Sequence, residues 1–361
     1  PVGLIASLVP TTNPELTPPG VGIFAIKCRD AVVFSPHPRS QRTTLETVAI
    51  MRRALEREGA PVDLIQCVEK PSIPAAQYLM TRADMVQATG GRDMVKAAYS
   101  SGTPALGVGA GNSTMVIDET ADVADAARNT RISKTSDFGS GCSADGNLVV
   151  ESSIYASLRD CLVAEGGHLA SPDETARLRA VYWDDEGRRT ADTIAVSAQS
   201  LAERAGFAIA PDRRFIITEQ TEIGRDNPFS SEKLGVVLSM FRYEGFDDAL
   251  DKVRAIFDVG GRGHSCGIYS FDDGHIDRLA RLAPVSRIMV RQPQSKANAG
   301  SFTNGMPMTS SLGCGTWGGN ITSENIHLKH YMNVTWVSRP IAEDRPSEEE
   351  LFGEYYGGPV D

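Results

Sequence analysis

Residues 85–107 have the sequence MVQATGGRDMVKAAYSSGTPALG. The apolar run Met85–Thr89 predicts a strand, which the turn-forming pair Gly90-Gly91 ends. Met94–Tyr99 has the apolar spacing of a helix, and Pro104–Gly107 predicts a second buried strand. A strand, a crossover helix and another strand form the unit from which parallel sheets are built. The stretch therefore predicts an α/β fold in which ligands bind at the carboxyl ends of the strands.

Short apolar runs and helical patterns alternate in the same way on the amino-terminal side of this stretch. Pro10–Pro19 is rich in turn-forming residues and predicts a loop. We expect residues 1–117 to form one domain with a doubly wound, mainly parallel sheet. The further strands expected in it are Val2–Val9, Ala31–Phe34, Val62–Val68 and Met115–Ile117, and the further helices are Thr43–Glu58 and Ile73–Met80.

A second domain of the same kind is expected over residues 118–325. Its segment Ser295–Asn325 is dominated by Gly, Ser, Thr and Asn, but the apolar residues within it favour an ordered binding loop. Residues 326–361 should follow as an edge strand, Tyr331–Val337, and an acidic surface tail from Glu343. The second domain is expected to contain helices at Asp122–Ser133, Ser153–Ala164, Asp173–Val181 and Phe246–Phe257, and strands at Leu148–Val150, Phe215–Thr218, Val236–Phe241 and Arg287–Val290.

Composition excludes several classes of protein. A formal charge of −10 without a basic cluster argues against nucleic-acid binding, and no apolar run is long enough to span a membrane. The six cysteines are scattered without a C-x-x-C pair, which is typical of reduced thiols in the cytoplasm. The chain begins at Pro1 without an initiator Met or a signal-type apolar core, and we expect a segment of a longer protein rather than one with its leader removed.

Cys142 lies in the polar stretch Asp137-Phe138-Gly139-Ser140-Gly141-Cys142-Ser143. The two glycines allow the backbone to come close to a reacting carbonyl and leave the thiol unshielded. A thiolate is a strong nucleophile, and a polar loop favours it. A plain turn with a small buried cysteine explains the loop as well, so a catalytic role depends on the other segments.

Four segments resemble motifs of the aldehyde dehydrogenase superfamily, in the same order along the chain. The resemblance implies that Cys142 is the nucleophile and that the Asn13 amide contributes to an oxyanion hole. It also implies that the Glu232 carboxylate holds the ribose next to nicotinamide, and that the fold has two doubly wound parallel-sheet domains and a C-terminal oligomerisation strand. The segments are Val9-Pro10-Thr11-Thr12-Asn13-Pro14, Ala88-Thr89-Gly90-Gly91 with Met94-Val95, Gly139-Ser140-Gly141-Cys142 and Glu232-Lys233-Leu234-Gly235.

Longer phrases are similar to the coenzyme A-acylating branch of this superfamily, which includes the aldehyde half of bifunctional aldehyde–alcohol dehydrogenases. The branch implies NAD-dependent, reversible oxidation of a short aldehyde to acyl-CoA through a thiohemiacetal and a thioacyl enzyme on Cys142, with coenzyme A as co-substrate. The phrases are Phe34-Ser35-Pro36-His37-Pro38-Arg39, residues 94–102, residues 107–112 and residues 312–320.

Val108 supplies a chemical argument for the acylating branch. Hydrolytic aldehyde dehydrogenases place a Glu at the matching position, where it activates the water that cleaves the thioacyl enzyme. Valine cannot move a proton, so attack by water loses a general base, worth about a hundredfold to ten-thousandfold in rate. A thioester that water attacks slowly can wait for the thiol of coenzyme A. Packing of a strand is the other interpretation of Val108, and the two are compatible.

His264 lies in Gly261-Arg262-Gly263-His264-Ser265, which matches the Gly-x-Gly-His segment of the branch. An imidazole titrates near neutral pH, so His264 could deprotonate either thiol, and a purely structural role is equally open. His327 and His330 form an H-x-x-H pair. We expect no metal there, because no carboxylate or thiol completes a ligand set nearby and the chemistry needs none.

The cofactor is expected to be NAD. NADP is the alternative, because Arg39 could bind its extra phosphate, although an ordinary surface charge explains Arg39 as well. The resemblance places Ser35, His37 and Arg39 around the adenosine ribose and the Gly90 turn at the pyrophosphate, where helix N-termini bind anions. The full set of expected cofactor contacts is Ser35, His37, Arg39, Thr89, Gly90, Gly91, Met94, Val95, Val108, Gly109, Glu232 and Leu234.

The branch implies acetaldehyde or propionaldehyde as substrate. Ser140-Gly141 and the hydroxyl-rich segment 306–311, with Arg262 or Arg291, favour an anionic tail as in sulfoacetaldehyde. Alternatives are a hydrolytic aldehyde dehydrogenase, a phosphate-dependent semialdehyde dehydrogenase and a non-catalytic scaffold. Tyr331–Val337 resembles the strand that joins a neighbour's sheet in the family, which predicts a homodimer or homotetramer.

Overall fold

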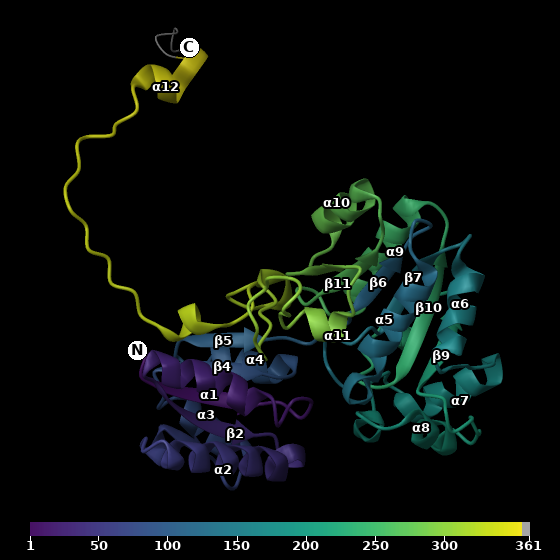
Figure 1. Ribbon diagram of the computed structural model, residues 1–361, viewed down its shortest axis with the longest axis horizontal. Helices are drawn as coiled ribbons and strands as arrows, with labels where there is room; N and C mark the ends of the chain where they lie inside the picture. Colours follow the sequence, from purple (N-terminus) through teal and green to yellow (C-terminus); the bar gives the residue numbers. More distant parts are fainter. Residues whose placement is uncertain (356–361) are drawn as a thin grey trace.

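Most strands of the chain are buried on both faces, as in parallel sheets covered by helices on both sides. The computed structural model describes residues 1–355 and contains two such sheets, which lie side by side in Figure 1. Buried apolar clusters lie on either face of each sheet. The prediction of an α/β fold with two doubly wound parallel sheets is therefore confirmed.

The first sheet has the strand order β3-β2-β1-β4-β5, with every neighbouring pair parallel. This order agrees with the strand–helix alternation expected from residues 1–107. The strands are β1 Leu4–Val9, β2 Ala31–Pro36, β3 Ile65–Cys67, β4 Met85–Thr89 and β5 Ala105–Val108, and the helices are α1 Thr17–Cys28, α2 Gln41–Arg57, α3 Ile73–Met80 and α4 Arg92–Tyr99.

The second sheet has the order β12-β11-β6-β7-β10-β9-β8 and is also parallel throughout. Its strands are β6 Thr114–Ile117, β7 Asn147–Glu151, β8 Gly167–Leu169, β9 Phe215–Gln220, β10 Val237–Tyr243, β11 Cys266–Tyr269 and β12 Ile288–Val290. Its helices are α5 Val123–Thr135, α6 Tyr155–Ala164, α7 Pro172–Tyr182, α8 Ala198–Arg204, α9 Phe246–Val259, α10 Asp273–Leu282 and α11 Gln294–Ala297, and α12 Glu348–Phe352 lies in the C-terminal tail.

Two expectations about the first domain were wrong. Residues 17–19 belong to helix α1 rather than to a loop, because a proline in the first turn of a helix costs no hydrogen bond. The strand Met115–Ile117 belongs to the second sheet, where β6 pairs with β7 and β11. The boundary between the two sheets therefore lies between Val108 and Thr114, before the expected residue 117.

The short connection between β5 and β6 decides how the sheets face each other. The chain leaves the carboxyl end of β5 at Val108 and enters the amino end of β6 at Thr114, with five residues between them. The carboxyl edge of the first sheet therefore faces the amino edge of the second. Ligand contacts at the carboxyl ends of strands, as expected from sequence, are thus confined to the first sheet.

The segment after β12 returns to the first domain, and Figure 1 shows it crossing the junction in yellow-green. Leu312, Ile326 and Tyr331 are buried in the same cluster as β1, β2 and α1. Residues 312–325, assigned from sequence to the second domain, therefore pack partly on the first. The physical reason is that the apolar side chains of Leu312 and, just beyond the segment, of Ile326 are buried in the core of the first domain.

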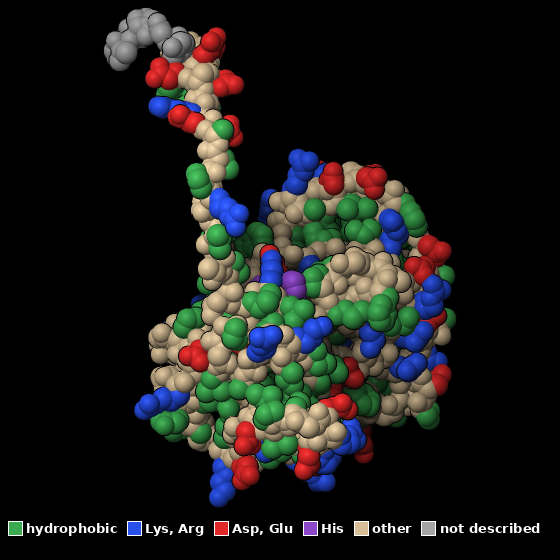
Figure 2. Space-filling model, turned by 60° about the vertical axis from the view of Figure 1, so that its left-hand side comes forward, with side chains coloured by type: hydrophobic (Ala, Val, Ile, Leu, Met, Phe, Trp, Pro, Cys, Tyr) green, Lys and Arg blue, Asp and Glu red, His purple; other side chains and the backbone are tan. Residues whose placement is uncertain are grey.

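The expected edge strand Tyr331–Val337 pairs with no strand within residues 1–355. Tyr331 ends a 3-10 turn, Leu328–Tyr331, and beyond it Val334 and Trp336 are exposed on an arm that stands clear of the body (Figure 2). A strand needs a neighbouring strand for its hydrogen bonds, and the described residues offer this segment none. In the same residues 1–355, no helix is both long and apolar enough to cross a membrane.

Candidate active site

A cavity of about 430 Å³ lies between the facing edges of the two sheets. The first sheet contributes loops that follow β1, β2, β4 and β5, and the second contributes loops that precede β7 and β10. Twelve of the fifteen residues predicted for the site line it: Asn13, Ser35, His37, Thr89, Gly90, Gly91, Met94, Val108, Gly109, Cys142, Glu232 and Leu234.

The loop that carries Cys142 has an unusual backbone. Asp137 and Phe138 have φ of 48° and 51°, in the left-handed region, and Gly139 follows with φ of 70°. A Cβ at Gly111 would lie 2.1 Å from the carbonyl oxygen of Cys142. Only glycine therefore allows the β5–β6 connection to approach the candidate nucleophile this closely.

His264 does not line the cavity but lies directly behind the thiol. Its Nε2 is 3.0 Å from Cys142 Sγ, and its Nδ1 is 2.9 Å from Ser265 Oγ. Burial, and to a smaller extent the charge of Arg287, lowers the pKa of His264 to about 3. Burial raises the pKa of Cys142 to about 12, with Glu232 and Cys314 adding to the shift and Arg287 opposing it. The resting pair is therefore a neutral thiol beside a neutral imidazole.

Glu232 lines the same cavity as the Gly90 turn. Its Oε1 accepts a hydrogen bond of 3.0 Å from the backbone N–H of Gly111, and Arg189 Nη1 is 3.9 Å from its Oε2. Burial raises the pKa of Glu232 to about 7, against the opposing charge of Arg189. Near neutral pH this carboxyl group can accept hydrogen bonds from the hydroxyls of a ligand, or donate one when it is protonated.

Asn13 lies four residues before the first residue of α1, in the loop after β1, and lines the cavity. Its Oδ1 accepts a hydrogen bond of 3.0 Å from the hydroxyl of Thr12. That contact orients the amide and leaves its NH₂ group available to donate. A free amide donor in a cavity that also contains a thiol is what stabilisation of an oxyanion requires.

The turn at Gly90-Gly91 fits the pyrophosphate of a dinucleotide. Gly91 is the N-cap of α4, and a side chain there would extend into open space. Thr89 Oγ1 is buried at the cavity and has no hydrogen-bond partner among the described residues. An unpartnered hydroxyl and open backbone at a helix N-terminus are consistent with an anionic ligand.

Two predicted cofactor contacts lie elsewhere. Val95 is on the buried face of α4, where its Cγ1 would be 2.6 Å from a Cβ at Gly107. Arg39 is half-exposed outside the cavity, where its Nη1 donates to the carbonyl of Ala191 at 3.1 Å. Its guanidinium connects the two domains. Other residues of the same two motifs do line the cavity. Side-chain packing in the folded protein, which the motifs do not reveal, turns Val95 and Arg39 away from it.

Sequence reasoning also misplaced the cations near the aldehyde. Arg262 is paired with Asp258, and Arg291 lies over the ring of Phe271, 4.4 Å from its centroid. Neither lines the cavity, whereas Arg189 does, with Ile194, Ser310 and Leu312. The segment around Arg189 carries no motif, so nothing in the sequence could have identified it. Ser310 and Leu312 lie in segments that the sequence analysis singled out, the hydroxyl-rich segment 306–311 and the phrase 312–320.

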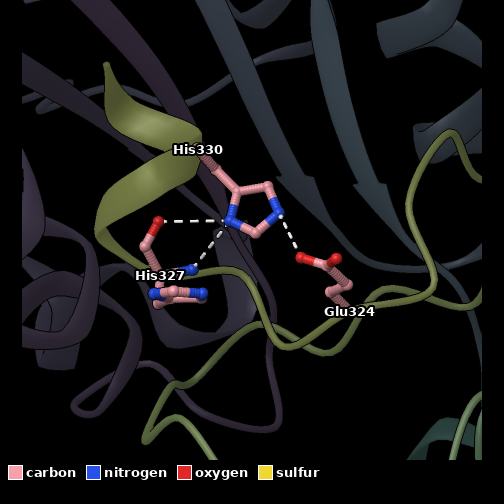
Figure 3. Close-up of side chains that lie close together, drawn as sticks. All are labelled: Glu324, His327 and His330. Carbon is pink, nitrogen blue, oxygen red and sulfur yellow. Dashed lines mark hydrogen bonds and ion pairs between the residues drawn. The ribbon is translucent and has the colours of Figure 1, made fainter.

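The H-x-x-H pair has a carboxylate beside it, contrary to our expectation (Figure 3). His330 Nε2 is 3.4 Å from Glu324 Oε2, and His330 Nδ1 accepts a hydrogen bond of 3.1 Å from the backbone N–H of His327. The same carboxylate oxygen is 2.5 Å from Lys329 Nζ. Within the described residues, ion pairing and the turn therefore account for this cluster, and the expectation of no metal stays a prediction.

Comparisons with known proteins agree with this geometry. A sequence model of the aldehyde dehydrogenase family matches residues 1–330. Sulfoacetaldehyde dehydrogenase of Acholeplasma sp. is 43% identical over 359 residues, 98% of this chain and 74% of that protein. An acetylating aldehyde dehydrogenase from Geobacillus thermoglucosidasius has a similar crystal structure, with a TM-score of 0.90 at 36% identity over 95% of this chain and 77% of that chain.

A further crystal structure shows propionaldehyde dehydrogenase of Rhodopseudomonas palustris with bound CoA and an acylated cysteine. It is 28% identical to this chain with a TM-score of 0.82, and the match covers 92% of this chain and 74% of that chain.

Proposed function

Because the chain belongs to the aldehyde dehydrogenase family, in its coenzyme A-acylating branch, we propose that it oxidises sulfoacetaldehyde to sulfoacetyl-CoA through a thioester on Cys142, with NAD as hydride acceptor and coenzyme A as co-substrate. NADP is the alternative cofactor. The observation that carries the assignment is the contact of 3.0 Å between Cys142 Sγ and His264 Nε2, beside a cavity that also contains Asn13 and Glu232.

The first half of the reaction follows from the neutral thiol–imidazole pair. As Cys142 Sγ attacks the aldehyde carbon, its proton passes to His264 Nε2, and the carbonyl oxygen becomes an oxyanion. The Asn13 amide and the backbone N–H of Cys142 donate hydrogen bonds to that oxygen. Thr89, the Gly90-Gly91 turn and Glu232 would hold the dinucleotide, which when bound accepts the hydride released by the collapsing thiohemiacetal.

The second half requires a thiol rather than water. His264 first releases to solvent the proton that it took from Cys142. It then takes the proton of the coenzyme A thiol as that sulfur attacks the thioester carbon, and it returns this proton to Cys142 Sγ as the bond from that sulfur to the acyl carbon breaks. Val108 is buried at the end of β5 on the cavity side and offers water no base, so transfer to coenzyme A competes well with hydrolysis.

The Asn13→Ala variant is expected to lower kcat by about a hundredfold to a thousandfold, which is the usual effect of removing one oxyanion donor. The KM for aldehyde should change much less, because the amide contacts an oxygen that becomes charged only during reaction. Steady-state assays of NADH formation measure both. Thr43→Ala, at an exposed position of α2 outside the cavity lining, is the control. A kcat within threefold of wild type in Asn13→Ala would contradict the role.

Sulfoacetaldehyde is favoured over other aldehydes by the relative of that name and by the hydroxyls that line the cavity, Thr11, Thr12 and Ser310. In a panel with acetaldehyde, propionaldehyde and succinate semialdehyde, the kcat/KM for sulfoacetaldehyde should be at least about tenfold above that for acetaldehyde. One charge-assisted hydrogen bond to the sulfonate accounts for such a difference. Equal values for the two would contradict the substrate assignment.

The same assay tests the acceptor. Omission of coenzyme A should stop NADH formation after about one equivalent per site, and inorganic phosphate should not restore it. Steady turnover without coenzyme A would indicate the hydrolytic alternative, and turnover with phosphate the phosphate-dependent one.

We also propose that the enzyme acts in the cytoplasm as a homodimer or homotetramer. The cysteines support the compartment, because all six are free thiols. The exposed arm supports the assembly, since Val334, Trp336 and Val337 are each at least 75% exposed in the single chain. A second subunit could bury this apolar surface.

A further inference from the structure

Cys142 and three residues behind it, His264, Ser265 and Ser113, form a closed ring of hydrogen bonds. Cys142 Sγ contacts His264 Nε2 at 3.0 Å, and His264 Nδ1 contacts Ser265 Oγ at 2.9 Å. Ser265 Oγ is 3.0 Å from Ser113 Oγ, and Ser113 Oγ donates to the carbonyl oxygen of Cys142 at 3.2 Å. The ring therefore starts at the side chain of Cys142 and ends at its main chain.

The sheet brings the two serines together. Ser113 immediately precedes β6 and Ser265 immediately precedes β11, and these strands are parallel neighbours with Thr114 opposite Cys266. Both serines and His264 are buried. Buried hydroxyls at fixed backbone positions hold one set of hydrogen bonds, because water cannot replace their partners.

Counting hydrogens gives the direction of every bond in the ring. A carbonyl oxygen only accepts, so the single hydroxyl hydrogen of Ser113 is directed at Cys142 O. Ser113 Oγ must then accept from Ser265, whose only hydrogen is used in that bond. Ser265 Oγ is left as an acceptor, so His264 Nδ1 must carry a hydrogen. Any other arrangement leaves one of the three contacts without a hydrogen.

We propose that Ser113 and Ser265 are positioning residues that hold His264 as the Nδ1-protonated tautomer, with the lone pair of Nε2 directed at the Cys142 thiol. In the other tautomer Nε2 would carry a hydrogen and could not accept the proton of the nucleophile. The inference rests on the proposed function, because it assigns the serines to the step in which Cys142 is deprotonated.

The surroundings of the Cys142–His264 pair favour a neutral imidazole in the resting enzyme. Burial, and to a smaller extent the charge of Arg287, lowers the pKa of His264 and keeps the resting imidazole neutral; Arg287 Nη1 donates to the backbone carbonyl of His264 at 3.0 Å. Around the thiol, Glu232, Cys314 and Arg287 are the other ionisable groups. After the proton moves to Nε2, Nδ1–H still donates to Ser265, and the ring of hydrogen bonds stabilises the imidazolium.

The test compares Ser265→Ala with Ser270→Ala. Ser270 is a buried serine just after the other end of β11, and its hydroxyl bonds to the backbone of Asp272. Both variants should lose similar thermal stability, because each loses the two hydrogen bonds of one buried hydroxyl. Only Ser265→Ala should lose kcat, by about tenfold to a hundredfold, with KM values within threefold of wild type. Ser265→Thr, which keeps the hydroxyl, should recover most of kcat.

Ser113→Ala and Ser113→Thr repeat the comparison at the other end of the ring. They provide the same test if one of the Ser265 variants fails to fold. Equal kcat losses in Ser265→Ala and Ser270→Ala would overturn the positioning role. So would a failure of both Ser265→Thr and Ser113→Thr to recover kcat.

A measurement without substrates separates this inference from the proposed function. Nitrogen-15 spectra of the histidine rings, with the His264 signals assigned by His264→Asn, report the tautomer directly. We expect a pyrrole-type Nδ1 and a pyridine-type Nε2 in the wild type, and a mixture of tautomers in Ser265→Ala. A pyridine-type Nδ1 in the wild type would overturn the inference while leaving the dehydrogenase activity intact. The expected spectrum in a protein that oxidises no aldehyde would support the ring and overturn only the proposed function.

Discussion

The Cys142→Ser variant is expected to fold normally and to lose at least about 10⁴-fold in kcat for acyl-CoA formation. A serine hydroxyl is a far weaker nucleophile than a thiol, and His264 would have to take a proton from a much weaker acid. An ester on serine is also a poorer donor to coenzyme A than a thioester. Stopped-flow assays of NADH formation should show neither a burst nor steady turnover.

Cys161→Ser is the matched control for this experiment. Cys161 is a half-buried thiol on α6, remote from the cavity lining, and its loss should leave kcat within twofold of wild type. Mass spectrometry after mixing with aldehyde and NAD, in the absence of coenzyme A, should find the acyl group on the peptide that contains Cys142. An acyl group on Cys314 instead, or residual turnover above a hundredth of wild type in Cys142→Ser, would refute the assignment.

The Val108→Glu variant is expected to release free acid about a hundredfold faster than wild type when coenzyme A is left out. Val108 is 2% exposed and lines the cavity with Cys142, so a carboxylate there can act as base for an attacking water. Burial will raise the pKa of the introduced carboxyl group, because the charged form is desolvated. Hydrolysis should therefore increase as the pH rises through that pKa.

Val108→Gln separates base catalysis from side-chain size. It has nearly the same volume as the glutamate variant but cannot accept a proton, so its hydrolysis should stay near the wild-type rate at every pH. The measurement is free acid by chromatography, together with the acyl-CoA formed when coenzyme A is present. Equal hydrolysis in both variants would show that a wider cavity, rather than the lost base, admits water.

The sequence alone determined the local elements and the motifs. Apolar runs over Met85–Thr89 and Ile73–Met80 predicted a strand and a helix with the bounds that the structure has, because short-range hydrophobic periodicity decides such elements. The order of four motifs predicted the family, which the comparisons confirm. Their residues Asn13, Cys142 and Glu232 do line one cavity, although their roles stay predictions until the variants are measured.

The tertiary structure decided what depends on residues far apart in the chain. Cys142 and His264 are 122 positions apart, and they meet because β7 and β11 both pair with β6, so the segments before these two strands lie together at the amino edge of the second sheet. The facing of the two sheets follows from the short β5–β6 connection, which no local pattern encodes. It brought Arg189 into the cavity and placed Arg39 outside it. Periodicity and motifs report on neighbours along the chain, whereas the direction of a side chain and its hydrogen-bond partners depend on which strands pair.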